Sequence, residues 1–373
     1  MKKFALYFLA AAALFAGCSE KNIEPSVNAD DAWMYDETLP VPIRFSASSG
    51  SLTKGAINNV SDMVGKTFGF YAVDSGADHA NPAEGWSIST PNLSMPQGAM
   101  ATCEEIGDGK VRFNFLEGPY YYEQTDWTPY TFYGYYAHIE DIEAPDYSED
   151  QYENKTSEYI YVFLNIGQTD ILWGKAAPAA PGSVETSKGS IAYGFNAPYL
   201  RNGGKQPFMT FKHVTACLEV TAQVEASKQA GASPVKMTIK EFELKEVPIK
   251  DALFIAHKDA TKEGTFANQA RRQTGSLFMK GIDPAMILTD SPQSIGNSLF
   301  LSPVQGPITT SLKYVVGGTE FTTNIVLNPQ GGFEAGKRYR YNFKIAAPEQ
   351  IIIEATVEPY IDAWDENIDV DKD

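Results

Sequence analysis

The stretch Val41-Pro42-Ile43-Arg44-Phe45-Ser46-Ala47-Ser48 decides how this 373-residue chain folds. Its odd-numbered positions are apolar, and its even-numbered positions carry polar residues or proline. Because successive side chains of a strand point to opposite faces, this alternation predicts a strand with one buried face. Pro42 has no N–H to donate, so we expect the strand at the edge of a sheet. The side chains on the buried face are Val41, Ile43, Phe45 and Ala47.

The same alternation recurs to the end of the chain, between turns supplied by 30 Gly and 22 Pro. It predicts an all-β protein with roughly seven strands on each side of residue 248, enough for two β-sandwich domains. We place the domains at 41–248 and 249–373, with a second possible division near residue 205. Gly317-Gly318 predicts a two-residue hairpin, and a change of apolar parity predicts a bulge near Lys240-Glu241. Other expected strands are 68–73, 111–115, 131–137, 159–166, 208–224, 236–247, 312–316, 321–327, 339–345 and 351–357.

The N-terminus reads as an export signal. Two lysines precede the apolar run 4–16, which is too short to span a bilayer permanently. Ala16 and Gly17 stand directly before Cys18, as small residues do in a bacterial lipobox. We therefore expect a signal peptide at 1–17, a lipid on Cys18 that ties the protein to a membrane, and a polar tether over 18–40.

Composition argues against nucleic acid as a partner. Lys and Arg number 30 against 47 Asp and Glu, which gives a net charge of −17. Residue patterns predict neither catalytic residues, nor a metal site, nor a cofactor, so we do not expect an enzyme. The acidic tail 365–373 lacks the glycine and closing glutamate of a calcium loop, and we expect His213 on the polar face of a strand. The four isolated histidines are His79, His138, His213 and His257.

Two cysteines remain besides Cys18, and their pairing is open at this point. Cys217 lies in an expected strand and Cys103 in a polar stretch. Spacing alone does not tell whether their Cα atoms approach within bonding distance.

Several segments in order along the chain resemble the fimbrillin family, the type V pilus subunits of Gram-negative bacteria. The resemblance begins with the lipobox at Cys18 and with strand 41–48, followed by Leu52-Thr53-Lys54-Gly55-Ala56. It continues through Phe68-Gly69-Phe70-Tyr71-Ala72, Thr131-Phe132-Tyr133-Gly134-Tyr135-Tyr136-Ala137, Asp170-Ile171-Leu172-Trp173-Gly174-Lys175-Ala176, Phe211-Lys212-His213-Val214-Thr215-Ala216 and Phe333-Glu334-Ala335-Gly336-Lys337-Arg338-Tyr339-Arg340-Tyr341, ending at Trp364.

The resemblance implies a lipoprotein precursor of two tandem transthyretin-like β-sandwich domains with Greek-key-type connections, located at the outer membrane and in a cell-surface pilus. It also implies that a trypsin-like maturation protease cuts after Lys54, with Arg44 as a weaker candidate. Strand 41–48 then leaves, and the C-terminal strand of another pilus subunit fills its groove. The implied partners are like or unlike subunits and a host or bacterial surface ligand.

Two alternatives stay open. After Trp364 only Ile368 and Val370 alternate as a donor strand would, so the donor strand begins nearer Ile361 or the chain does not donate. A tip or accessory subunit therefore fits as well as a stalk subunit. A surface-anchored lipoprotein that binds glycans on exposed aromatic rings is the other alternative. Its candidate faces are Tyr120-Tyr121-Tyr122, Trp86 and Trp127.

Overall fold

The computed structural model describes most of the chain, in two compact units, Met1–Leu39 and Pro40–Asp373. In the first unit it describes one short helix, η1 (Ala29–Met34). Cys18, Lys54 and the C-terminal residues 360–373 lie outside the described residues. The described residues are 29–48, 60–74, 98–107, 110–124, 130–142, 159–176, 185–186, 189–190, 195–202, 204–225, 236–267, 272–347 and 350–359.

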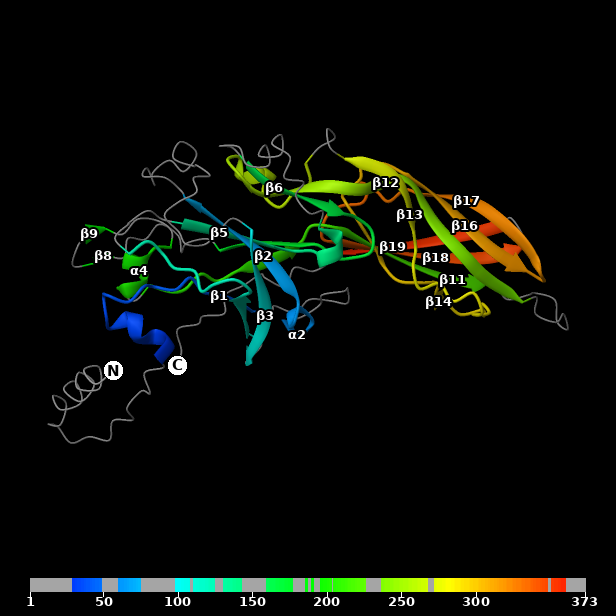
Figure 1. Ribbon diagram of the computed structural model, residues 1–373. Helices are drawn as coiled ribbons and strands as arrows, with labels where there is room; N and C mark the ends of the chain where they lie inside the picture. The colour runs from blue at the N-terminus through cyan, green and yellow to red at the C-terminus, as the bar shows by residue number, and fades with distance from the viewer. Residues whose placement is uncertain are drawn as a thin grey trace. The chain divides into compact units, whose positions relative to one another are not determined.

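The prediction of an all-β fold is confirmed, since strands dominate the described part of Pro40–Asp373 (Figure 1). The first sheet has the order β1 (Phe45–Ser48), β4 (Lys110–Phe115), β3 (Ala99–Gly107), β2 (Thr67–Asp74), β5 (Tyr130–Tyr136), β7 (Leu172–Ala176) and β10 (Thr210–His213). The second contains β14 (Gln293–Ser294), β11 (Ala216–Val224), β18 (Lys337–Ala347) and β19 (Gln350–Pro359), with β15 (Leu299–Leu301) on β11. The third contains β13 (Gln273–Phe278), β12 (Met237–His257), β16 (Ile308–Val316) and β17 (Thr319–Leu327), with β6 (Tyr159–Asn165) on β12.

The remaining elements are short. They are the strand pair β8 (Glu185–Thr186) and β9 (Gly189–Ser190), and the helices α2 (Val60–Met63), η2 (Ile139–Asp141), α4 (Ala197–Arg201) and η4 (Ala260–Lys262). Within the described residues, none of the helices is both long and apolar enough to cross a membrane.

The seven-stranded sheet curls until its two ends meet. β1 ends the strand order at one side, and β10 ends it at the other. Ser46 in β1 nevertheless forms a parallel bridge with Phe208, two residues before β10 begins. Aromatic rings fill the curl, and Gly134 makes room for them, because a Cβ there would lie 2.9 Å from the ring of Phe70. The buried rings on this face are Phe45, Phe68, Phe70, Phe113, Phe132 and Phe211.

The second and third sheets enclose another apolar core. β11 and β18 supply one side of it, and β12, β16 and β17 supply the other. β11 and β18 run parallel, although most strand pairs in the molecule are antiparallel. The predicted hairpin is confirmed, since β16 and β17 pair across Gly317-Gly318, and both glycines have positive φ.

The long strand β12 joins the second core to a separate apolar cluster formed with β6, β2, β5 and β7. Its first half pairs with β13 and β16, and its second half pairs with β6. The predicted bulge is confirmed by a register shift between Ile239 and Glu241. β12 is continuous through residue 248, where we expect the division between domains, and that division stays a prediction.

Candidate functional site

The N-terminal strand segment 41–47 places its four apolar side chains inside the protein. Val41 and Ala47 are fully buried, Phe45 is 2% exposed and Ile43 is 3% exposed. Pro42, Arg44 and Ser46 alternate with them and are half-buried. The alternation in the sequence therefore predicted correctly which side chains face the core.

Phe45 is the central contact of this segment. Its ring stacks on Phe70 at 4.7 Å between centroids and meets Phe132 edge-on at 4.9 Å and Phe115 at 5.6 Å. Such aromatic pairs stabilise a core beyond the area that they bury. Burial of Val41, Ile43 and Phe45 together contributes roughly 5–8 kcal/mol, at about 1.5–3 kcal/mol for each side chain.

Backbone hydrogen bonds hold the segment on two sides. Four residues of β1 pair in register with β4, from Phe45 opposite Phe113 to Ser48 opposite Lys110. β1 lies at the edge of the strand order, as Pro42 predicted, and the curl of the sheet also brings residues 207–209 against its other side. Beyond the β4 ladder, the bonds are Ile43 N–H to Tyr120 O at 2.9 Å, Tyr122 N–H to Val41 O at 3.0 Å, Ser46 N–H to Pro207 O at 3.2 Å and Met209 N–H to Ser46 O at 2.7 Å.

Removal of this segment would therefore leave two things behind. One is an apolar groove lined by aromatic rings, and the other is a set of backbone groups without partners on both of its walls. An added strand of suitable sequence would fill such a groove and pair with its walls by β-addition. Arg44, the weaker of the two predicted cleavage residues, lies inside the held segment. Lys54 and Cys18 lie outside the described residues.

The C-terminal strand β19 has the same alternation as segment 41–47 but not its burial. Ile353 and Val357 stand opposite Phe343 and Tyr339 of β18, which are fully buried. Ile353 is nevertheless 40% exposed, and Val357 is 49% exposed. Among the described residues, β19 pairs with β18 and with no strand beyond it.

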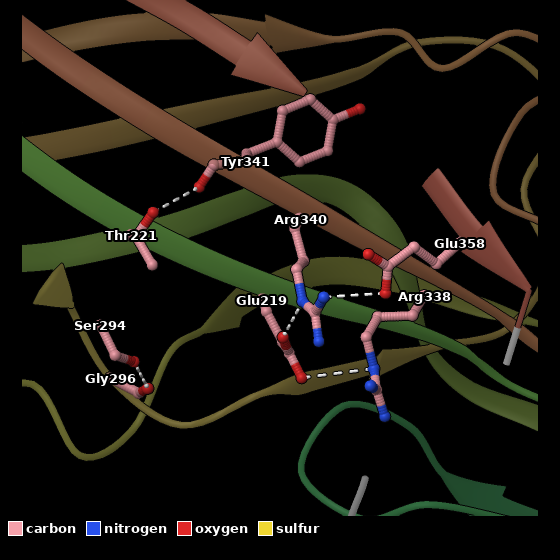
Figure 2. A network of polar contacts seen from close by, with 8 residues as sticks. All are labelled: Glu219, Thr221, Ser294, Gly296, Arg338, Arg340, Tyr341 and Glu358. Atoms are coloured by element: carbon pink, nitrogen blue, oxygen red, sulfur yellow. Dashed lines mark hydrogen bonds and ion pairs between the residues drawn. The ribbon is translucent and has the colours of Figure 1, made fainter. Parts of the chain in front are cut away.

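Ion pairs tie β19 to its sheet (Figure 2). Arg340 of β18 donates from Nε to Glu219 of β11 and from Nη1 to Glu358 of β19, each at 2.8 Å. The buried Arg338 approaches the other oxygen of Glu219, with Nε 3.4 Å from Oε1. The carboxylate of Glu219 thus faces two arginines. If Glu358 moves away, Arg340 keeps its ion pair with Glu219.

A second polar contact lies further along the same strand pair. Lys344 and Asn342 both donate to the carboxylate of Glu354. The hydrogen bond from Lys344 has the larger effect and that from Asn342 the smaller, and both lower the pKa of Glu354 below its usual value of 4.5. Because all these groups are exposed or half-buried, the pairs stabilise β19 weakly.

Two of the three tyrosines proposed as a sugar-binding face are turned inward, and Tyr121 between them is half-buried. Tyr120 and Tyr122 are buried, and burial raises the pKa of Tyr122 well above 10. Tyr122 packs edge-on against Phe132, inside the aromatic core. Trp86 and Trp127 lie outside the described residues. Tyr120 and Tyr122 therefore do not form an exposed stacking surface.

The cysteines and His213 have structural surroundings. Cys103 in β3 and Cys217 in β11 are free and buried, and burial raises the pKa of each thiol to about 12. His213 is buried rather than exposed on a polar face. Its Nδ1 lies 2.8 Å from Oδ2 of Asp170, which is also buried. Asp170 comes from a different part of the chain, so no local pattern signals this pair. Within the described ranges, no three His, Cys, Asp or Glu side chains come together as metal ligands would.

Comparisons with known proteins agree with this architecture. A family model described as fimbrillin-like matches residues 97–360. A solved structure of a candidate cell adhesion protein from Bacteroides uniformis superposes with a TM-score of 0.50 at 13% identity, covering 86% of this chain and 98% of that one. This likeness concerns the fold alone.

Two further solved structures superpose less closely. A candidate cell adhesion protein from Bacteroides ovatus has a TM-score of 0.46 at 14% identity, over 87% of this chain and 99% of that one. The tip fimbrial protein Mfa3 from Porphyromonas gingivalis has a TM-score of 0.37 at 11% identity, over 86% and 100%. No curated protein sequence matches the chain significantly.

Proposed function

The chain belongs to the fimbrillin-like family, and on that premise we propose that it is a structural, non-catalytic subunit of a cell-surface pilus that supports adhesion. Its partners are other pilus subunits and, at the adhesive surface, a host or bacterial ligand. The alternative of a glycan-binding lipoprotein loses support, because Tyr120 and Tyr122 are buried.

We propose further that the chain is exported as a lipoprotein precursor and held at the outer membrane through Cys18. The lipid anchor and strand 41–48 lie on the same side of Lys54 in the sequence. One cut after Lys54 therefore frees both together, which makes the anchor provisional.

One observation carries this proposal. Segment 41–47 is well packed in the core, but it is joined to the rest of the fold only at its C-terminal end, through the stretch that contains Lys54. The segment fills an aromatic groove and bonds to both walls, yet it lies N-terminal to all the other strands that the structure describes. Such a strand can leave after one cut, and a strand of another subunit can take its place. The uncut strand thereby prevents premature polymerisation.

A cut after Lys54 explains this exchange better than a cut after Arg44. A break after Arg44 would leave Phe45 and Ala47 on the protein side of the cut, still covalently attached inside the groove. A break after Lys54 removes all four buried side chains at once.

Limited trypsin treatment tests the proposal. We expect the treated protein to begin at Gly55 by N-terminal sequencing and to form oligomers, either alone or with another subunit, while the uncut protein stays monomeric. A K54Q variant should resist both the cut and the assembly, whereas the matched variant R44Q should behave like the wild type. Clipped material that stays monomeric with every subunit offered, while it retains its circular dichroism spectrum, would reject strand exchange for this chain.

Membrane attachment needs its own test. Protein recovered from the cell surface should start at acylated Cys18 before processing and at Gly55 after it. A C18A variant should be lost from the outer membrane fraction, and its retention there would refute the lipid anchor.

A further inference from the structure

The groove occupied by segment 41–47 has four sites, and we number them by their present occupants. Site 1 holds Val41, site 2 holds Ile43, site 3 holds Phe45 and site 4 holds Ala47. Building on the proposed strand exchange, we propose that this groove takes a strand from a different kind of chain and rejects this chain's own C-terminal strand. The partner strand carries an aromatic residue for site 3 and a small residue for site 4.

Site 3 demands an aromatic ring because aromatic rings surround it. Phe70, Phe132 and Phe115 lie 4.7, 4.9 and 5.6 Å from the ring of Phe45, each measured between centroids. A smaller occupant would leave a cavity among these three rings, since a packed core relaxes only in part around a missing group.

Site 4 demands a small side chain. Ala47 is fully buried and stands in register opposite Val111, which is also fully buried. A larger or charged occupant would have to displace close-packed neighbours or leave an uncompensated charge inside the protein.

β19 cannot satisfy site 3 in any register or direction. Its sequence, Gln-Ile-Ile-Ile-Glu-Ala-Thr-Val-Glu-Pro over 350–359, contains no aromatic residue. The register that puts Ala355 in site 4 puts Ile353 in site 3, where it fills only part of the space. The same register places Glu349 in site 1, which is fully buried around Val41.

The rest of the C-terminal sequence fails for a different reason. Tyr360 and Trp364 are its only aromatic residues, and each has an acidic residue two positions away on both sides. When either ring occupies site 3, carboxylates fall into sites 2 and 4, whichever way the strand runs. Burying an unpaired carboxylate costs far more than a ring contributes. The flanking residues are Glu358, Asp362 and Glu366.

These mismatches define the partner by its chemistry. It is a strand with the pattern apolar-x-apolar-x-aromatic-x-small and without acidic residues at those four positions. Because residues 350–373 lack that pattern, the groove favours joining to an unlike subunit over polymerisation with a second copy of this chain.

Peptide competition tests the inference. Full-length protein is labelled with a fluorophore on the segment N-terminal to Lys54 and is then cut after Lys54, so that the labelled segment 41–47 stays in the groove without a covalent link. Peptides are added, and release of the labelled segment is followed by fluorescence anisotropy. We expect the peptide 41–48 to displace the label and its F45A version to bind about 100-fold more weakly or worse. The peptide 350–359 should not displace the label even at about 100 times the concentration at which peptide 41–48 does so.

A substitution that creates binding is the sharper arm. The I353F version of peptide 350–359 places a phenyl ring in site 3 and keeps Ala355 in site 4, so it should bind at least about tenfold more tightly than its parent. An I352F version carries the ring on the opposite face of the strand and serves as the matched control, without gain.

The outcomes separate this inference from the proposed function. If peptide 350–359 competes as well as 41–48, selection against the chain's own strand is wrong and strand exchange survives. If the label never leaves with any peptide, including 41–48, the groove does not exchange strands and the proposed function fails.

Discussion

Strands β1 and β19 begin as near equals in sequence and end in opposite environments. Segment 41–47 and residues 351–357 each carry four apolar side chains at alternate positions. The first set is at most 3% exposed, whereas Ile353 and Val357 of the second are 40% and 49% exposed. Period-2 alternation therefore predicts that a strand forms and which side chains share a face, but it does not predict what covers that face.

The difference comes from what lies opposite each strand. The curl of the seven-stranded sheet wraps aromatic rings around Phe45 and brings residues 207–209 against β1. β19 ends its own sheet and depends on β18 for pairing and on ion pairs at Glu354 and Glu358 for attachment. β1 is thus held by burial and by backbone bonds on both of its sides, whereas β19 is held by its pairing with β18 and by charge.

The comparison predicts its largest effect for truncation of matched side chains. F45A should lower the free energy of unfolding by about 3–5 kcal/mol, because it opens a cavity among three rings. I353A should cost less than about 1 kcal/mol, since its side chain is already substantially exposed. Urea denaturation of both variants measures the difference, and similar losses would contradict the contrast between the two strands.

Thiol reactivity should report where F45A loosens the fold. Both cysteines are buried with pKa values of about 12, so at pH 8 neither is present as an accessible thiolate and both should react slowly. In F45A the thiol of Cys103, in the same sheet as β1, should react about tenfold faster through local opening. Cys217 should react at the wild-type rate, and the rate with a thiol reagent, resolved by peptide mapping, distinguishes the two.

Within the ion-pair network, the inner glutamate should matter more than the outer one. E219Q removes the carboxylate that faces both the buried Arg338 and Arg340, and it should cost about 1–2 kcal/mol of unfolding free energy. E358Q removes an exposed pair and should cost less than about 0.5 kcal/mol. Equal losses in thermal unfolding would mean that β19 is integral to the sandwich rather than attached to its edge.

The smallest effect is a pH dependence at β19. Because Lys344 and Asn342 lower the pKa of Glu354 in the folded protein, this carboxylate stabilises the strand above its usual pKa of 4.5. That contribution disappears as the pH falls through the lowered pKa. Hydrogen exchange of the β19 amides, corrected for intrinsic rates, should lose protection by about threefold or less below that pH. E354Q should abolish this loss, while amides of β4 opposite β1 should show no corresponding change.

Much of the local structure followed from the sequence. Alternation at 41–47 predicted the buried face, the Gly317-Gly318 pair predicted a hairpin, and the parity change near Lys240 predicted a bulge. These features depend on the two-residue period of a strand and on backbone conformations that glycine adopts easily, so neighbouring residues determine them. Family membership also follows from the sequence, through the match over residues 97–360.

Only the tertiary structure decided which alternating strand is enclosed. Closure of the sheet between Ser46 and Phe208, the parallel pairing of β11 with β18 and the burial of Tyr120 and Tyr122 all join residues that are distant in the sequence. No local pattern specifies such contacts, because a strand has the same period whether its apolar face meets a core or water. The sequence therefore determined that β1 and β19 form, and the curl of the first sheet decided that β1 alone of the two is buried.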